Sequence, residues 1–156
     1  DTLTRLPGRE IQCDLTFAAG GLPDANGVHR PLPVLVMAAS HSRFAAACLL
    51  STRSTDGLIA GMWQLIGHDF KAVPNRLVWD REAGIGKARL CEAVAAFAGA
   101  IGTEIVQALP EIGIKGIVER TNGYMKRSFS PGRHFSNPQD VQDQLSSSNL
   151  SHVATG

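Results

Sequence analysis

EIQCDLTF, residues 10–17, is an alternation of apolar and polar side chains. This period of two predicts a β-strand with one apolar face. A carboxylate, Asp14, stands on the polar face of the strand. An ionised side chain within a strand of a small domain is costly unless it is paired, hydrogen-bonded or bound to a metal ion. Asp14 is therefore a candidate functional residue, although a buried Asp satisfied by backbone N–H groups is a commoner arrangement.

The segments on either side predict a mixed α/β domain. Further strands are expected at Leu32–Ala39, Arg43–Leu50, Arg76–Trp79 and Thr103–Leu109, with Gly20–Pro31 as a loop between the first two strands. The second and third strands form an antiparallel hairpin. Helices are expected from a cap near Ser54 to Gly67, from about Leu90 to Gly102, from Lys115 to Phe129, and from Asn137-Pro138 onward. The order is three strands, helix, strand, helix, strand and helices.

The bulk composition predicts one ordinary globular domain. The chain has 156 residues, of which 44% are hydrophobic and 19% charged, and its net charge is +1. Residues 1–145 form this domain in our interpretation, and the Ser-rich residues 146–156 form a loosely ordered tail. Cys13, Cys48 and Cys91 are far apart and form no CxxC pair, so free thiols in a reducing cytosol are expected. No apolar run reaches the roughly 18 residues of a membrane span.

Two further carboxylates have positions that suit chemistry. Asp80 follows the apolar strand residues Leu77, Val78 and Trp79, and Glu119 lies in the predicted helix 115–129. Three carboxylates suit phosphodiester transfer, because Mg²⁺ or Mn²⁺ prefers oxygen ligands. Two such ions can activate the attacking oxygen and stabilise the leaving oxygen. The sequence has no Gly-x-Ser-x-Gly elbow and no Cys–His pairing signal, which agrees with a reaction that needs no protein nucleophile.

Five short motifs stand in order along the chain: QCDLT at 12–16, SRF at 42–44, LVWD at 77–80, KGIVER at 115–120 and NGY at 122–124. Their order and spacing resemble those of the retroviral-integrase-like DDE transposases of bacterial insertion sequences. Some members of the family have a Lys or Arg seven residues after the Glu, and Lys126 stands at that position here. The resemblance extends from about Gly8 to Leu145.

The resemblance implies a ribonuclease H-like α/β fold, with a mixed five-stranded sheet flanked by helices. Asp14 and Asp80 would lie on neighbouring strands and Glu119 would reach in from a helix, so that the three carboxylates converge on one shallow, solvent-open site. They would hold two Mg²⁺ or Mn²⁺ ions. The reaction would be DNA cleavage by water, followed by attack of the freed 3′-hydroxyl on target DNA.

The implied setting is that of a DNA recombinase. The partners would be DNA, both element ends and target, and further copies of the chain in an active homo-oligomer. Such transposases carry an N-terminal DNA-recognition domain, and the expectation is that this domain is missing here. The location would be the cytoplasm, at the bacterial nucleoid. Two rivals stay open: a ribonuclease H-like nuclease, and a non-catalytic DNA-binding relic of a mobile element.

Basic residues gather between Lys115 and Arg133, where five basic residues and one acid give a local net charge of +4. These side chains are either a solvated face or a surface that contacts DNA phosphates. The DDE resemblance favours phosphate contact for Lys115, Lys126 and Arg127, whereas Arg120 can support the fold instead. Other side chains have simpler interpretations. We expect Asp24 and Glu82 in loops, His41 and His134 on the surface, and Trp63 and Trp79 as core anchors.

Overall fold

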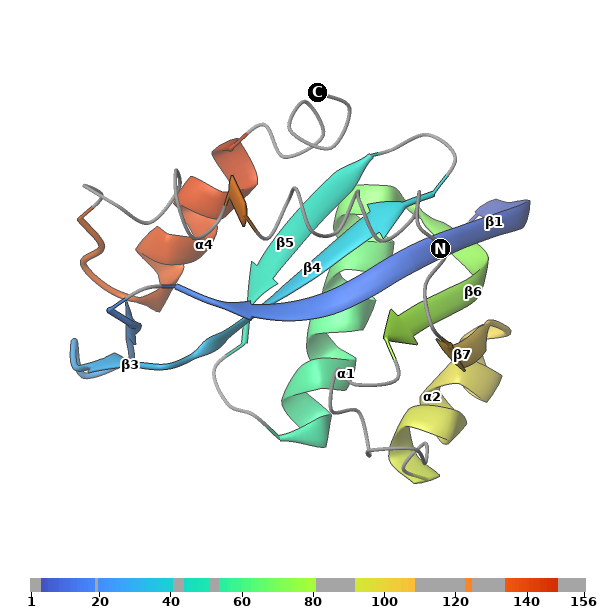
Figure 1. Ribbon diagram of the computed structural model, residues 1–156, viewed down its shortest axis with the longest axis horizontal. Helices are drawn as coiled ribbons and strands as arrows, with labels where there is room; N and C mark the ends of the chain where they lie inside the picture. The colour runs from blue at the N-terminus through green and yellow to red at the C-terminus, as the bar shows by residue number, and fades with distance from the viewer. Residues whose placement is uncertain are drawn as a thin grey trace.

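The structure is a computed structural model that describes residues 4–18, 20–40, 44–50, 54–80, 92–108, 123–124 and 134–148. Five strands form a mixed sheet in the order β5-β4-β1-β6-β7 (Figure 1). They are β1 (Thr4–Phe17), β4 (Pro33–Ala39), β5 (Ala45–Leu49), β6 (Ala72–Asp80) and β7 (Glu104–Ala108). β1 pairs antiparallel with β4 and parallel with β6, while β4–β5 is antiparallel and β6–β7 is parallel. The predicted α/β class and five-stranded sheet are confirmed.

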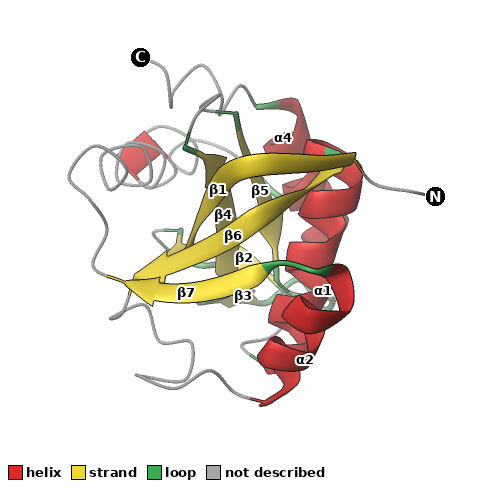
Figure 2. Ribbon diagram, turned by 90° about the vertical axis from the view of Figure 1, so that its right-hand side faces the viewer, coloured by secondary structure: helices red, strands yellow, loops and turns green. Residues whose placement is uncertain are grey.

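Helices supply the crossovers that parallel strands need. α1 (Thr55–Gln64) continues into a π-helical segment, η1 (Leu65–Phe70), before β6 begins. α2 (Glu92–Ile101) lies between β6 and β7 in the chain. Figure 2 shows α1 and α2 together against one side of the sheet. The last described helix is α4 (Pro138–Ser147), so the first two residues of the expected tail, 146 and 147, are helical.

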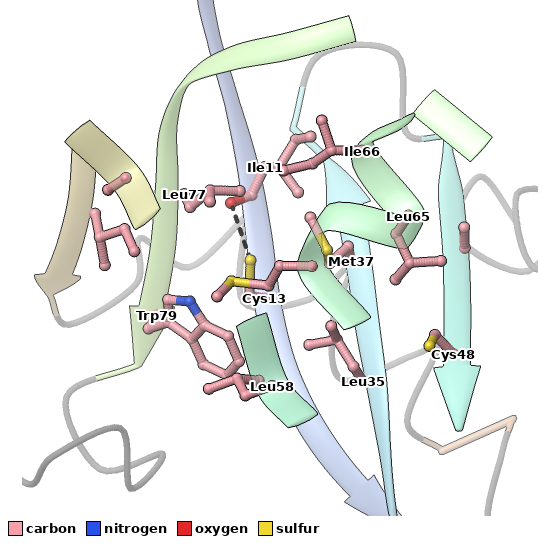
Figure 3. Packing of buried hydrophobic residues seen from close by; sticks show 14 of the residues in the cluster. Ile11, Cys13, Leu35, Met37, Cys48, Leu58, Leu65, Ile66, Leu77 and Trp79 are labelled. Carbon is pink, nitrogen blue, oxygen red and sulfur yellow. Dashed lines mark hydrogen bonds between the residues drawn. The ribbon is translucent and has the colours of Figure 1, made fainter. Parts of the chain in front are cut away.

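One face of the sheet packs against α1, η1 and α2. The odd-numbered residues of β1 and β4 point into this core, as Cys13, Leu35 and Met37 show (Figure 3). Trp79 is fully buried among them, as predicted. The prediction for Trp63 is wrong, because this side chain is 48% exposed and contacts Phe97 of α2 edge to face at a ring-centroid distance of 6.4 Å.

The opposite face of the sheet packs against α4. Val34, Val36 and Ala38 of β4 contribute to this second core, with Val141 and Leu145 from the helix. Asn137 caps the helix, because its side chain accepts a hydrogen bond from the N–H of residue 140 at 2.9 Å. Both faces of the sheet therefore pack against helices, and Gln12 and Thr16 at even-numbered positions of β1 are buried as well.

α4 also covers the edge of the sheet. Gln142 accepts a hydrogen bond from the Leu49 N–H at 2.9 Å and donates to the Ala47 carbonyl at 3.3 Å. The side-chain amide thus pairs with the outer edge of β5 in the way that another strand would. Unpaired strand edges invite association with other chains, so this contact shields an exposed edge.

The end of the first helix differs from the prediction. Ser54 caps α1 as expected, with its Oγ accepting from the Gly57 N–H at 3.1 Å. Gly67 does not end the helix, because the chain continues through η1 to Phe70. The left-handed residue that ends it is Lys71, with φ of 54°. Gly61 instead has a packing role: a Cβ there would lie 2.5 Å from Cδ2 of Leu50, so glycine lets α1 approach the sheet closely.

β6 is longer than the predicted strand Arg76–Trp79. It begins at Ala72 and includes Pro74, which lacks an N–H donor. Pro74 pairs with β1, but the pairing with β7 begins at Arg76, so no strand needs the missing N–H on that side. The Pro74 carbonyl accepts a hydrogen bond from Oγ1 of Thr103, at 2.9 Å. Proline at this position therefore fits the sheet.

The segment 20–31, expected as a loop, contains a small hairpin of β2 (Leu22–Pro23) and β3 (His29–Arg30). Asp24 organises its turn by accepting from the N–H groups of Asn26 and Val28 at 2.9 and 3.0 Å, and from Nε of Arg30 at 2.6 Å. The Arg30 bond and the two backbone bonds hold the pKa of Asp24 below its usual value. These contacts explain Asp24 as a turn residue.

The described cysteines, Cys13 and Cys48, are buried free thiols, as predicted. Cys91 lies outside the described residues. Among the described helices, none has the length and apolar character required to cross a membrane.

Candidate active site

The parallel pairing of β1 and β6 brings Asp14 and Asp80 side by side. Their predecessors, Cys13 and Trp79, are partners in the register. Asp14 and Asp80 are each one residue further on, and neighbouring strands lie roughly 5 Å apart. Since Cys13 and Trp79 both point into the first core, the alternation along each strand assigns positions 14 and 80 to the opposite face of the sheet. The side chain of Asp80 itself lies outside the described part.

The carboxylate of Asp14 is half-buried and held by the backbone. Its Oδ1 accepts a hydrogen bond from the Leu15 N–H at 2.8 Å. Burial raises the pKa of the Cys13 thiol well above its ordinary value, and the negative charge of the neighbouring Asp14 raises it further. Asp14 is thus an oriented anionic oxygen donor near the carboxyl ends of two parallel strands.

Two buried polar side chains, neither of them among the predicted site residues, flank Asp14 on the same strand. Gln12 is 4% exposed and Thr16 is 3% exposed. Among the residues that the structure describes, neither Nε2 of Gln12 nor Oγ1 of Thr16 has a hydrogen-bond partner. Both residues belong to the QCDLT motif, which was the available signal. Its alternation indicated a polar strand face, but did not indicate that the face is covered.

The remaining predicted site residues lie beyond what the structure describes. These are Glu119, Lys115, Lys126 and Arg127. Of the helix predicted at 115–129, Gly123 and Tyr124 are described; both are helical, and Tyr124 packs against the second core. Within the described residues, no three His, Cys, Asp or Glu side chains come together to hold a metal ion. The predicted convergence of the three carboxylates therefore stays a prediction.

The other polar candidates have simple positions. His134 is exposed, as predicted, and its backbone carbonyl accepts a hydrogen bond from Nε2 of Gln144 at 3.1 Å. His41 and Glu82 lie outside the described residues.

The donor set at this point of the fold suits a hard divalent cation. Carboxylate oxygens are the ligands that Mg²⁺ and Mn²⁺ prefer. Asp14 provides such an oxygen with its orientation fixed, and residue 80 provides a second aspartate at the neighbouring register position. Aspartates at positions 14 and 80 are thus of the residue type that would hold such an ion, together with a further ligand from elsewhere in the chain.

Comparisons with solved structures agree with this architecture. The chain is similar to a chain of the simian T-cell lymphotropic virus intasome in complex with PP2A regulatory subunit B56 gamma, with a TM-score of 0.64 and 18% identity over 92% of its length. It spans half of that chain. The catalytic core domain of BIV integrase aligns with a TM-score of 0.54 at 12% identity, covering 94% of this chain and 78% of that one.

A third solved structure covers both chains almost fully. The HTLV-2 integrase catalytic core domain in complex with magnesium, in a dimeric form, aligns with a TM-score of 0.54 at 13% identity over 97% of each chain. No protein-family model matches the sequence, and no curated protein matches it. The structural similarities, at identities this low, establish the fold. The chain has the ribonuclease H-like fold of retroviral integrase catalytic core domains.

Proposed function

We propose that this chain is the catalytic core of a DDE-type DNA transposase or integrase, with Asp14, Asp80 and Glu119 as its metal-binding carboxylates. The observation that carries the proposal is the register of β1 and β6. It juxtaposes the two aspartates of the QCDLT and LVWD motifs at adjacent strand ends, within an integrase-core fold. Glu119 comes from the sequence resemblance to bacterial insertion-sequence transposases, and its motif, KGIVER, supports transposase over other enzymes of this fold.

The proposed reaction is an in-line displacement at phosphorus. The oxygen of water attacks a DNA phosphodiester, forms a new P–O bond, and expels the 3′-oxygen as a hydroxyl group. That 3′-hydroxyl then attacks target DNA in a second displacement of the same kind. Two bound Mg²⁺ or Mn²⁺ ions would supply activation of the attacking oxygen and stabilisation of the leaving oxygen. Asp14 contributes a carboxylate that the Leu15 N–H holds in one orientation.

The setting of the reaction belongs to the same proposal. The HTLV-2 integrase core was solved with magnesium and as a dimer, and the simian virus chain belongs to an intasome. By analogy, we infer Mg²⁺ or Mn²⁺ as the cofactor, DNA ends and target DNA as partners, and a homo-oligomer as the active form. We also infer a cytoplasmic location at a bacterial nucleoid, from the resemblance to insertion-sequence enzymes.

Nicking of supercoiled plasmid DNA in Mn²⁺ tests the proposal. Removing a hydrogen-bond partner of a metal ligand lowers metal affinity or activity by about 10- to 100-fold. Loss of a ligand itself through Asp14→Asn, Asp80→Asn or Glu119→Gln should therefore slow nicking by about 100-fold or more. Asp143→Asn is the matched control, because Asp143 is an exposed carboxylate of α4 that pairs with Gln139 at 2.9 Å. Equal nicking by the wild type and Asp14→Asn would contradict the proposal.

The joining step separates the proposal from its closest rival. Purified chain, labelled donor DNA and a target plasmid should yield joined donor–target products if the chain is a transposase or integrase. Mn²⁺-dependent nicking without any joined product, across donors with free 3′-hydroxyl ends, would favour a nuclease of the same fold. Absence of both nicking and metal-linked stabilisation would favour a DNA-binding relic.

A further inference from the structure

Two buried polar groups without described partners lie two residues before and two residues after Asp14 on β1. Four buried side-chain atoms lack a hydrogen-bond partner among the residues that the structure describes: Nε2 of Gln12, Oγ1 of Thr16, Oγ of Ser40 and Nε1 of Trp79. Two of the four belong to the residues two positions before and after Asp14. A buried donor without a partner destabilises a folded protein, and native proteins contain few of them. The pair at Gln12 and Thr16 therefore requires an explanation.

The neighbours of these two side chains on the sheet cannot satisfy them. Gln12 lies between Ala38 of β4 and Val78 of β6, and Thr16 lies beside Val34 of β4. All three neighbours have apolar side chains. Along β1, the alternation assigns residues 12, 14 and 16 to one face, so the polar group nearest to both side chains on this strand is the carboxylate of Asp14. Their polar atoms thus lie on either side of the proposed metal ligand.

Their burial restricts what can bind them. At 4% and 3% exposure, Gln12 and Thr16 offer no surface that a DNA strand could contact. A group as small as a water molecule is the kind of partner that such buried donors accept. Mg²⁺ and Mn²⁺ sites in proteins retain several water ligands. Outer hydrogen bonds to metal ligands hold them in place and strengthen the binding of the metal.

We propose that Gln12 and Thr16 are positioning residues that hydrogen-bond the water ligands of a divalent cation held by Asp14. This inference rests on the proposed function, since it requires a metal site at Asp14. In the metal-free protein the two side chains lack partners, and the cation with its waters provides them. The unpaired donors therefore lower the stability of the metal-free protein, and metal binding removes this cost.

The test uses near-isosteric variants that remove the polar atoms: Gln12→Met and Thr16→Val. Thermal unfolding is measured in EDTA and across a Mn²⁺ titration, which yields a melting temperature without metal and an apparent Kd for Mn²⁺. We expect each variant to melt in EDTA at the wild-type temperature or above it, because an unpaired buried polar group has been removed. We expect the Kd to rise by about 10- to 100-fold.

Thr103→Val is the matched control. Thr103 is also a buried threonine, directly before β7, but its Oγ1 donates to the Pro74 carbonyl at 2.9 Å. Its variant should melt at a lower temperature in EDTA and bind Mn²⁺ as tightly as the wild type. If Thr16→Val and Gln12→Met instead behave like this control, the two residues have structural roles and the inference is overturned.

Asp14→Asn separates this inference from the proposed function. Loss of the Mn²⁺-dependent shift in Asp14→Asn, together with weakened binding in Gln12→Met and Thr16→Val, supports both. Loss in Asp14→Asn with wild-type binding in the other two variants overturns the positioning role alone. The metal site, and the inference with it, is overturned by either of two results. One is that Mn²⁺ raises the melting temperature of Asp14→Asn as much as that of the wild type, and the other is that saturating Mn²⁺ does not raise the melting temperature of the wild type.

Discussion

Cys48 shows how a buried thiol couples the stability of this domain to pH. Its Sγ is near the Leu49 carbonyl at 3.6 Å and Oε1 of Gln64 at 3.7 Å. Burial raises the pKa of Cys48 from its ordinary value of 9.0 to about 11, and the negative charge of Asp69 adds to the shift. The unfolded chain therefore loses this proton at a lower pH than the folded protein. Cys48 stabilises the fold below pH 9, and this contribution is lost as the pH rises to about 11.

The predicted loss of unfolding free energy between pH 9 and pH 11 is roughly 2 to 3 kcal/mol, since each pKa unit corresponds to about 1.4 kcal/mol. Cys48→Ala removes the titrating group, so its stability should fall less steeply across this range, whatever its stability at pH 8. Urea unfolding of both proteins at several pH values measures the two slopes. Parallel slopes would show that Cys48 keeps an ordinary pKa in the folded state.

At some residues, the sequence pattern does not predict whether a side chain is buried. Both tryptophans follow apolar patterns, but Trp79 is fully buried and Trp63 is 48% exposed. The helical core positions of α1 are taken by Leu58, Gly61 and Met62, and Trp63 lies beside that stripe. In β1, Gln12 and Thr16 stand at polar positions of the alternation and are nonetheless buried. The alternation predicts which side chains share a face of the strand, but it carries no information about what packs on that face.

At the scale of elements, the clearest dependence on a single contact is the edge of β5. The Gln142 amide pairs with the Leu49 N–H and the Ala47 carbonyl in place of a neighbouring strand. Gln142→Ala leaves both backbone groups without these bonds, which should cost about 1 to 3 kcal/mol of unfolding free energy. The opened edge should also promote self-association on concentration. Chemical unfolding and analytical ultracentrifugation measure the two effects.

Gln139→Ala is the control for this prediction. Gln139 lies one turn earlier on α4, is exposed, and its Nε2 donates to Oδ1 of Asp143 at 2.9 Å. Exposed contacts of this kind contribute little, so the variant should remain within about 0.5 kcal/mol of the wild type. If the two variants are equally stable, the pairing of Gln142 with β5 does not protect the sheet edge.

Most elements could be predicted because their signals are local. Ser54 and Asn137 begin helices as their capping side chains indicate, and Gly102, with φ of 75°, ends α2. The errors arise where tertiary contacts decide. Gly67 suggests a helix end, but the chain continues through η1, where Leu65 and Ile66 are fully buried in the first core. A proline is unusual within a strand, but Pro74 fits in β6 because the pairing of β6 with β7 begins only at Arg76.

For the candidate site, the sequence predicted the residues and the structure supplies the backbone relationship of two of them. Asp14 and Asp80 lie 66 positions apart, and the strand motifs alone do not determine their relative register. That register depends on how β1 and β6 pair, which includes a shift between Leu6 and Glu10. A slip of one residue would place position 80 on the wrong face of the sheet. The expectation that Asp14 and Asp80 lie on neighbouring strands therefore came from the family resemblance, and not from the local sequence pattern.

The net charge of the whole molecule is +1, but its basic residues are unevenly distributed along the sequence. The segment 115–133 is basic, and the proposed function makes it a DNA-binding surface. If Lys126 contacts a phosphate, Lys126→Ala should weaken binding to duplex DNAs of different sequence by a similar factor. The slope of log K against log salt should fall by about one unit. Fluorescence anisotropy at several salt concentrations measures this slope.

Lys71→Ala provides the matched control for charge. Lys71 is exposed and precedes β6, at the end of that strand opposite to Asp80. Its removal changes the net charge equally but should leave the salt slope unchanged, because it lies far from the proposed site. A wild-type slope in Lys126→Ala would assign Lys126 to a solvated face, and equal effects of both variants would indicate a nonspecific dependence on net charge.

The central place of β1 has a consequence for motion. At Ile11, Gln12 and Cys13 the strand is paired with β4 on one side and β6 on the other. Amide protons at such positions exchange with solvent mainly when the whole domain opens, so they report the global free energy of unfolding. We therefore expect the backbone that carries Asp14 to stay fixed over the microseconds to milliseconds in which loops and domains rearrange. Under the proposed function, conformational steps of the catalytic cycle would then occur in the segments around this strand.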